Sequence, residues 1–237
     1  MNEIQMYQFA GGYGVASFSP FCLKLQAYLR LAGVPYRAVN VRDTSKAPTK
    51  KLPYIVDGDQ AVGDSGLIVT HLKNKAGIDP DAHLSAEQRA QAFVLTRMLE
   101  EHFAWLLVYS RWVDPDNAEN LKKIFFRKVP APVKMLIVPM LVRRVRRTIW
   151  GQGIGRHDKA AIYQRGRDDL DALATCLGDK NYLMGDQAST VDTVAFGFLA
   201  NLLNTPFPSP LQNHARKHAD LVRYVARMDQ AWFANND

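Results

Sequence analysis

The 237-residue sequence has little cysteine, no long apolar run and no leader-like beginning. Its two cysteines, Cys22 and Cys176, lie far apart, which excludes a disulfide framework and a cysteine metal site and favours a reducing compartment. No stretch approaches the ~20 apolar residues that cross a bilayer. Residues 1–7 lack the charged and apolar regions of a signal peptide. We therefore expect a soluble, cytoplasmic protein.

Histidine is also sparse. The six histidines are not expected to place two imidazoles on one helix face in the His-x-x-x-His spacing of a metal site, so no metal ion is expected. His71 and His102 fall within expected helices, where a role in the core or at its boundary is the ordinary one.

One long segment lacks acidic residues. Between residues 120 and 157 there are ten basic side chains and no carboxylate. Because the whole chain carries only +7, the remainder is net acidic, and a general nucleic-acid binder is not expected. An apolar run at 135–142 precedes four arginines, which suits an anionic membrane surface. A bundle helix with solvated arginines explains the same pattern, and we favour it. The arginines are Arg143, Arg144, Arg146 and Arg147.

The first half of the chain is organised around residues 51–65. An apolar, β-branched run is followed by Asp57-Gly58, a strong hairpin signal, and by a second short run, so two antiparallel strands are expected. Pro53 opens the first strand, where a missing N–H is tolerated. Asp64-Ser65 precedes an apolar pattern of helical spacing, as a polar N-cap does. The stretch predicts a hairpin and then a capped helix that ends near Lys75.

A strand, a helix and a second strand are expected ahead of this hairpin. Residues 4–9 have a strand pattern, Ser19 is a suitable N-cap, and Pro20 is the first residue of the helix. Residues 36–41 form the second strand, and this order requires a right-handed parallel crossover. Residues 1–76 are therefore expected to fold as βαβ-ββα.

Beyond a linker at residues 77–85, residues 86–237 are expected to be all helical. A long helix over 86–113 has apolar residues on more than one side, as the central helix of a bundle does. Three prolines should divide the next segment into two or three shorter helices: Pro130, Pro132 and Pro139. An extended loop is expected at Pro206–Pro210. Further helices are expected at 158–177, at 194–203 behind a Ser189–Asp192 capping box, and around 221–232.

Three motifs, together with the Pro53 hairpin and the capping box after residues 181–186, carry a resemblance to a known family. The motifs are Ser19-Pro20-Phe21-Cys22-Leu23-Lys24, Gly153-Ile154-Gly155-Arg156-His157 and Asp192-Thr193-Val194-Ala195-Phe196-Gly197. Nearly the whole chain resembles the glutathione transferases, and more narrowly their metaxin-like branch with the failed-axon-connections proteins. The resemblance implies an α+β thioredoxin-like N-terminal domain that binds glutathione, an all-helical C-terminal domain, and a homodimer.

The resemblance also implies where glutathione binds. Pro53 would be cis, Leu52 would offer its backbone to the cysteinyl part, and Asp64 with Ser65 would hold the γ-glutamyl end. The physical chemistry agrees, because a helix N-terminus suits a carboxylate and a nearby Asp suits an ammonium. Lys51 would meet the glycyl carboxylate. A surface hairpin, an ordinary capped helix and a solvated lysine explain the same residues without a ligand.

Ser19 stands where thioredoxin-like oxidoreductases carry their attacking cysteine. A serine cannot attack a disulfide in that way, but it can donate a hydrogen bond to the glutathione thiolate and so lower the pKa of the thiol. A plain N-cap role for Ser19 accounts for the residue equally well. Ser17 and Tyr13 compete for the contact with the sulfur. Cys22 is expected to be a small buried residue, with a reactive thiol as the alternative.

Two functions therefore stand open. The first is a Ser-type glutathione transferase that conjugates glutathione to an electrophilic, mostly apolar small molecule in detoxification. Its second substrate would bind between the domains, near residues 12–18 and 103–111. The second is a non-catalytic, metaxin-like adaptor that docks on a protein partner or a membrane surface. The residues of the hairpin favour the first function, and the basic segment favours the second.

Overall fold

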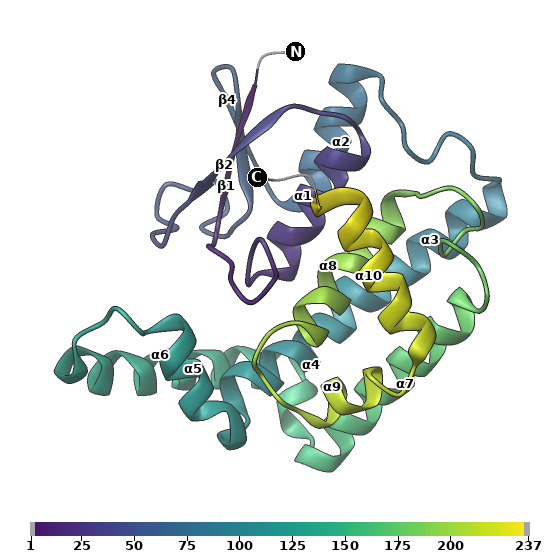
Figure 1. Cartoon of the computed structure of the whole chain (residues 1–237). Helices are drawn as coiled ribbons and strands as arrows, with labels where there is room; N and C mark the ends of the chain where they lie inside the picture. Colours follow the sequence, from purple (N-terminus) through teal and green to yellow (C-terminus); the bar gives the residue numbers. More distant parts are fainter. Residues whose placement is uncertain (1–2, 235–237) are drawn as a thin grey trace.

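The N-terminal part of the computed structural model, which describes residues 3–234, is a four-stranded mixed sheet with two helices (Figure 1). The strand order is β2-β1-β3-β4, formed by β1 (Ile4–Gln8), β2 (Tyr36–Asn40), β3 (Tyr54–Asp57) and β4 (Gln60–Gly63). β1 pairs in parallel with β2 and antiparallel with β3, which pairs antiparallel with β4. Between β1 and β2 runs α1 (Pro20–Leu31), and α2 (Ser65–Ala76) follows β4. The expected βαβ-ββα order is confirmed.

The β3–β4 hairpin turns at Gly58 and Asp59, one residue later than the Asp57-Gly58 signal suggested. Asp57 still pairs with Gln60 as part of the ladder. Gly58 has a φ of 63°, a left-handed conformation that glycine adopts without penalty. The Asp57 carboxylate is bound by His71 and Lys75 of α2.

α1 is buried along most of its length because it packs against two hydrophobic cores. Cys22 lies in the core under the sheet, whereas Leu23 lies in the core of the helical domain. The second contact is with α8 (Thr190–Leu203), where Gly197 permits a close approach. A Cβ built at Gly197 would lie 2.8 Å from the backbone nitrogen of Lys24. α1 therefore joins the two domains directly.

The second domain is all helical. Its helices are α3 (Ala86–Arg97), η1 (Met98–Phe103), α4 (Ala104–Val108), η2 (Tyr109–Val113), η3 (Pro115–Asn117), α5 (Ala118–Phe125), α6 (Ala131–Gln152), η4 (Ile154–Arg156), α7 (Lys159–Leu177), α8, α9 (Pro210–Ala215) and α10 (Ala219–Phe233). The run from α3 to η2 is continuous over residues 86–113, as expected, with π-helical turns in η1 and η2.

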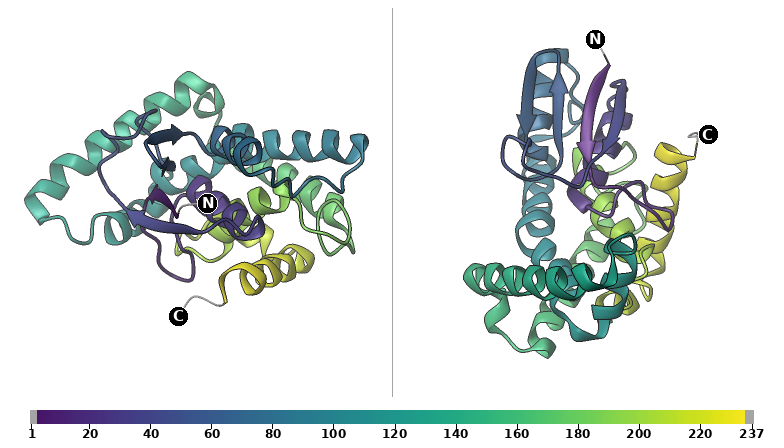
Figure 2. Two further views of the ribbon diagram at one scale, coloured as in Figure 1. Left: turned by 90° about the horizontal axis from the view of Figure 1, so that it is seen from above. Right: turned by 90° about the vertical axis from the view of Figure 1, so that its left-hand side faces the viewer.

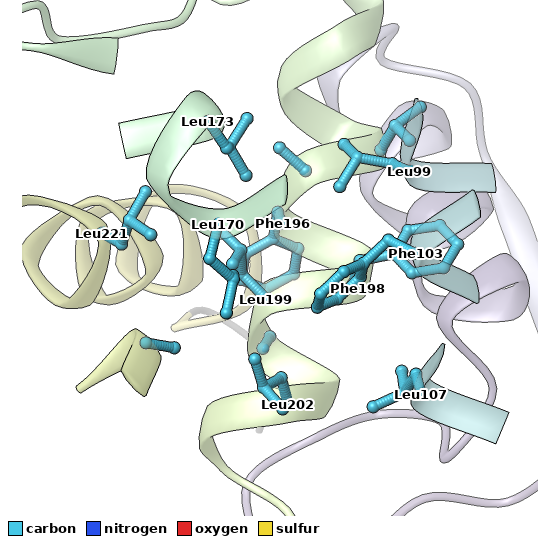
Figure 3. Close-up of a cluster of buried hydrophobic side chains, with 14 of the residues drawn as sticks. Leu99, Phe103, Leu107, Leu170, Leu173, Phe196, Phe198, Leu199, Leu202 and Leu221 are labelled. Carbon is cyan, nitrogen blue, oxygen red and sulfur yellow. The ribbon is translucent and has the colours of Figure 1, made fainter. Parts of the chain in front are cut away.

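α8 forms the centre of this domain. Every residue from Val191 to Leu203 is buried, which explains why the helix is apolar on all sides. The Ser189–Asp192 capping box at its start is present. Figure 3 shows side chains of α8 between those of the long helix, α7 and α10. The labelled residues are Leu99, Phe103, Leu107, Leu170, Leu173, Phe196, Phe198, Leu199, Leu202 and Leu221.

α6 runs without a break through Pro139, so the expected interruption there is wrong. A proline removes one helix hydrogen bond, here to the carbonyl of Met135. Met135 is 77% exposed and Pro139 is also exposed, so water can satisfy that carbonyl. α6 lies at the periphery of the molecule in all views (Figures 1 and 2). No helix within residues 3–234 is long and apolar enough to cross a membrane.

A short helix, α9, replaces part of the extended loop expected at Pro206–Pro210. Pro210 occupies its first position, and Ser209 caps it by accepting a hydrogen bond from the Gln212 N–H at 3.1 Å. The buried Gln212 side chain donates to the carbonyls of Leu202 and Thr205. These bonds hold α9 against the end of α8.

Candidate functional site

Pro53 and Asp64 meet at one end of the β3–β4 hairpin. Tyr54 pairs with Gly63 in the ladder, so the segments just beyond this pair, Leu52–Pro53 and Asp64–Ser65, lie side by side. The Leu52–Pro53 peptide bond is cis. Leu52 is buried, yet no other group within residues 3–234 hydrogen-bonds its backbone N–H or C=O. The structure thus brings together residues that the sequence placed in the glutathione site, with backbone groups free for a ligand.

The start of α2 presents unused hydrogen-bonding groups at the same place. Asp64 is the N-cap, and its Oδ1 accepts from the N–H groups of Gly66 at 2.9 Å and Leu67 at 3.2 Å. Its second carboxylate oxygen, and both the hydroxyl and the N–H of the buried Ser65, have no hydrogen-bond partner in the described part of the chain. A helix N-terminus with a free hydroxyl and N–H can bind a carboxylate, and the free Asp64 oxygen can bind an ammonium. Lys51 is exposed nearby in sequence.

An ion-pair cluster fixes the hairpin to α2. Asp57, whose side chain is 4% exposed, lies 2.7 Å from Lys75 Nζ and 2.8 Å from His71 Nε2. The pKa of the Asp57 carboxyl is lowered because Lys75 hydrogen-bonds it and His71 adds a second bond, although burial opposes the shift. His71 therefore has the boundary role expected of it. The cluster ties the turn end of the hairpin to α2.

The three candidate activating hydroxyls differ in their surroundings. Ser17 is fully buried, and its hydroxyl donates to the Phe9 carbonyl at 2.7 Å. Ser19 is half-buried, and its oxygen caps α1 by accepting from the Cys22 N–H at 3.4 Å. Its proton can point to the Cys22 sulfur or to a ligand. Tyr13 is 63% exposed and tilts against the Phe18 ring. The role of each in catalysis stays a prediction.

Cys22 is fully buried, as expected of a small core residue. Burial raises the pKa of its thiol, and hydrogen bonds that the Ser19 hydroxyl, the Phe9 backbone and the Ser17 hydroxyl can donate to the sulfur only partly oppose this. The thiol is therefore protonated at neutral pH and shielded from solvent, which is the opposite of a reactive cysteine.

Two residues of the helical domain, Arg111 and Asn201, hydrogen-bond the loop before α1. Neither contact was predicted from the sequence. Arg111, only 4% exposed, donates to the Phe18 carbonyl at 2.9 Å and to Asn201 Oδ1 at 3.2 Å. Asn201 in turn donates to the Ser17 carbonyl at 3.1 Å. An arginine inside the apolar run of the long helix is the signal that could have revealed it, because buried charges need partners.

The loop before α1 lines a cavity of about 280 Å³ together with α1, α8 and α10. Residues 14–16 of this lining belong to the loop that was expected at the second-substrate pocket, whereas residues 103–111, the other expected wall, do not line this cavity. Arg111 hydrogen-bonds the Phe18 carbonyl of the same loop. The cavity is lined by Gly14, Val15, Ala16, Leu23, Phe196, Asp229 and Phe233.

A second cluster went unnoticed in the sequence. His214 and His218 are four residues apart, and their Nε2 atoms lie 3.4 Å from each other. The expectation that no two histidines share such a spacing was therefore wrong. Asp171 of α7 lies within hydrogen-bond distance of both.

His102 and Arg156 have structural roles elsewhere. His102 pairs with Asp169 at 2.7 Å. Arg156 packs on the Trp150 ring at the end of α6 and donates to the Trp150 carbonyl.

Comparisons with family models and with curated proteins agree with this geometry. Residues 20–117 match the glutathione S-transferase N-terminal domain, and residues 166–228 match the C-terminal domain. The chain is 30% identical to the isoprene-epoxide–glutathione S-transferase of Rhodococcus sp. strain AD45, covering 95% of this chain and 97% of that protein. It is 30% identical to Failed axon connections of Drosophila melanogaster and 26% identical to human Metaxin-1, but spans only 59% and 51% of their lengths.

Solved structures show the same fold. The β-etherase LigF from Sphingobium sp. strain SYK-6 aligns with a TM-score of 0.63 and 19% identity, covering 95% of this chain and 94% of that one. A glutathione S-transferase from Methylobacterium radiotolerans, solved with glutathione sulfonate, aligns with a TM-score of 0.56 and 18% identity, covering 96% and 91%.

Proposed function

The chain belongs to the glutathione S-transferase family, in the branch that includes the metaxins and Failed axon connections, and from this premise we propose that it is a working glutathione transferase. It would activate the glutathione thiol for attack on an electrophilic, mostly apolar small molecule. The observation that carries the proposal is that Leu52–Pro53 and Asp64–Ser65 lie side by side beyond the Tyr54–Gly63 pair. The Leu52 backbone and the Ser65 N–H and hydroxyl have no hydrogen-bond partner within residues 3–234. An adaptor would have no need to keep these groups unpaired.

Each end of glutathione has a complementary group in this proposal. The Leu52 backbone pairs with the cysteinyl part, as a short strand would. The Ser65 hydroxyl and N–H, at the positive end of α2, receive the γ-glutamyl carboxylate, and Asp64 receives the ammonium. Lys51 lies toward the glycyl carboxylate.

Ser19 is the proposed activating residue. Its hydroxyl can turn from the Cys22 sulfur to the glutathione thiolate, whereas the Ser17 proton is donated to the Phe9 carbonyl. A hydrogen bond at the N-terminus of α1 favours the thiolate over the thiol. The sulfur then forms a bond to the electrophilic carbon, and the leaving group takes the electron pair. Tyr13 is the second choice for this role.

Small epoxides are the first electrophiles to test, because the Rhodococcus relative is named for an isoprene epoxide. In an epoxide the ring oxygen takes the electron pair and then a proton from water. A homodimer and a cytoplasmic location complete the proposal. The free state of Cys22 and Cys176 is in keeping with a reducing compartment.

Calorimetric titration with glutathione tests the site directly. We expect the wild type to bind glutathione in the millimolar range or tighter and Ser65→Ala to lose at least about tenfold in affinity, as one hydrogen bond to a charged group predicts. Ser85→Ala is the matched control, because it removes a hydroxyl that caps α3, away from the hairpin. Failure of the wild type to bind at millimolar glutathione would overturn the transferase proposal.

Docking on a membrane or a partner is the second candidate function. It is favoured by α6, which exposes large apolar side chains close to arginines along one peripheral helix. The exposed apolar residues are Val133, Met135, Leu136, Met140 and Trp150. The transferase function requires glutathione to bind at the hairpin site and the docking function does not, so the glutathione titration tests the first and vesicle binding tests the second.

A further inference from the structure

Two imidazoles and a carboxylate converge in the helical domain, where α7 and α9 lie side by side away from the sheet (Figure 1). Asp171 comes from α7, His214 from α9, and His218 is the N-cap residue of α10. Asp171 Oδ1 lies 2.6 Å from His214 Nε2 and 2.8 Å from His218 Nε2. These three ligand atoms therefore form a compact triangle, built from three separate elements.

The triangle has nearly the dimensions of a tetrahedral metal site. Zinc–nitrogen bonds of about 2.0–2.1 Å place two ligand nitrogens about 3.4 Å apart. The two Nε2 atoms are already separated by 3.4 Å. The carboxylate oxygen is closer than a ligand would be, but the Asp171 side chain is 51% exposed and can move back by roughly 0.6–0.8 Å without disturbing the core. Only this small rotation separates the observed arrangement from a ligand set.

The backbone under the cluster is rigid. α7 and α9 touch directly at Gly166, where an added Cβ would lie 2.4 Å from Leu211 Cδ2. Leu211 and Leu221 are fully buried, and the Gln212 side chain ties α9 to the end of α8. The ligand-bearing elements are therefore positioned by packing, so that little ordering entropy opposes ion binding.

We propose that Asp171, His214 and His218 bind one divalent transition-metal ion of the zinc class. Imidazole nitrogens with one carboxylate are ligands that suit zinc, copper and nickel rather than calcium or magnesium. Neutral imidazoles and one carboxylate offset half of the divalent charge. The fourth position is filled by water on the exposed side. The ion cross-links α7, α9 and the start of α10, and it shares no residue with the hairpin site.

Zinc titration of the untagged, chelator-treated full chain tests this proposal. We expect calorimetry to give one ion per chain with micromolar or tighter affinity, and zinc to raise the midpoint of thermal unfolding. His214→Ala and His218→Ala should each weaken binding by at least about tenfold. His157→Ala is the control, because His157 is exposed outside the cluster.

Cobalt binding gives a second measurement that does not depend on stability. Four-coordinate Co²⁺ absorbs visible light much more strongly than the hydrated ion, so the wild type should acquire intense bands at one equivalent. Asp171→Asn keeps the shape of the side chain, so it can be tested where an alanine variant folds poorly. It should lose most of this absorption. The proposal would be overturned if the wild type showed neither a heat of zinc binding nor the cobalt bands. It would also be overturned if both histidine variants bound zinc as tightly as the wild type. The cluster would then be a carboxylate shared by two histidines.

Discussion

At the scale of single residues, the direction of each hydroxyl proton separates the candidate activators. Ser17 donates inward to a backbone carbonyl, and the Ser17 oxygen also accepts from the Ser19 N–H at 3.3 Å. Ser17 thus shapes the loop, whereas Ser19, at its end, can face a ligand. The Arg111–Asn201 clamp fixes this arrangement from the other domain. Two neighbouring serines of the same chemistry therefore have different expected roles.

Ser19→Ala should lower kcat/KM for glutathione conjugation by about 10–100-fold, the value of one hydrogen bond to a charged group. Ser17→Ala should instead lower the free energy of unfolding by about 1–3 kcal/mol, because it removes both hydrogen bonds of a buried hydroxyl, one to the Phe9 carbonyl and one from the Ser19 N–H. Steady-state kinetics with a small epoxide and denaturant unfolding measure the two effects. A loss of activity in Ser17→Ala with normal activity in Ser19→Ala would reverse the assignment.

Acid stability depends on Asp57 at the same scale. Its folded pKa lies below the ordinary value of 3.8, so the unfolded chain takes up the proton first as the pH falls. The stabilisation by Asp57 is complete above pH 3.8 and is lost as the pH falls through the lower folded value. Asp57→Asn should therefore show a smaller loss of unfolding free energy across this window. Asp59→Asn, in the same turn and exposed, should keep the wild-type response.

At the scale of elements, the contact between α1 and α8 couples the site to the helical core. α1 carries Ser19 at its start and packs on the most buried helix of the molecule. The approach depends on Gly197, which leaves no room for a side chain against the Lys24 backbone. A change in this contact should therefore be felt in both domains.

Gly197→Ala should destabilise the protein by about 1–3 kcal/mol, because a methyl group there forces the two helices apart. Gly151→Ala in α6 is the control, since its Cβ meets no atom within 4 Å. Replacing a helical glycine by alanine in open space is neutral or stabilising by about 1 kcal/mol. Thermal unfolding of the two variants makes the comparison. Equal stability of both would show that α1 and α8 can separate without cost.

Periodic patterns predicted most elements because those patterns are local. The strands, α1, α2 and the central α8 follow from alternation, capping residues and helical spacing in one stretch. The unbroken course of α6 through Pro139 and the presence of α9 did not follow from local patterns. The exposure of Met135 permits the first, and the tertiary hydrogen bonds of Gln212 stabilise the second. The Asp171–His214 contact joins residues 43 positions apart, so the sequence offered only the histidine pair. His214 lies in α9 and His218 caps α10, so no single helix pattern in the sequence joins the two.

At the scale of the whole molecule, positive charge is concentrated on a peripheral helix. Leu136, Met140, Arg143 and Arg147 follow each other at spacings of four, three and four residues, so they lie along one exposed stripe of α6. None of the arginines in this stripe pairs with a carboxylate within residues 3–234. The stripe is apolar toward the start of α6 and basic toward its end. This arrangement suits an interface that is apolar and anionic at once.

Membrane docking through this stripe makes a quantitative prediction. Wild type should sediment with phosphatidylserine-containing vesicles and not with neutral ones, and added salt should weaken the binding. Arg143→Gln/Arg147→Gln removes about 1 kcal/mol for each arginine near the surface and should weaken binding by about 30-fold. Arg165→Gln/Arg223→Gln, with the same net charge but exposed on α7 and α10, should bind nearly as the wild type does. If the two double variants lose binding equally, net charge alone accounts for it. If the wild type does not sediment with anionic vesicles, the stripe has no membrane role, and the glutathione titration alone then decides the function of the chain.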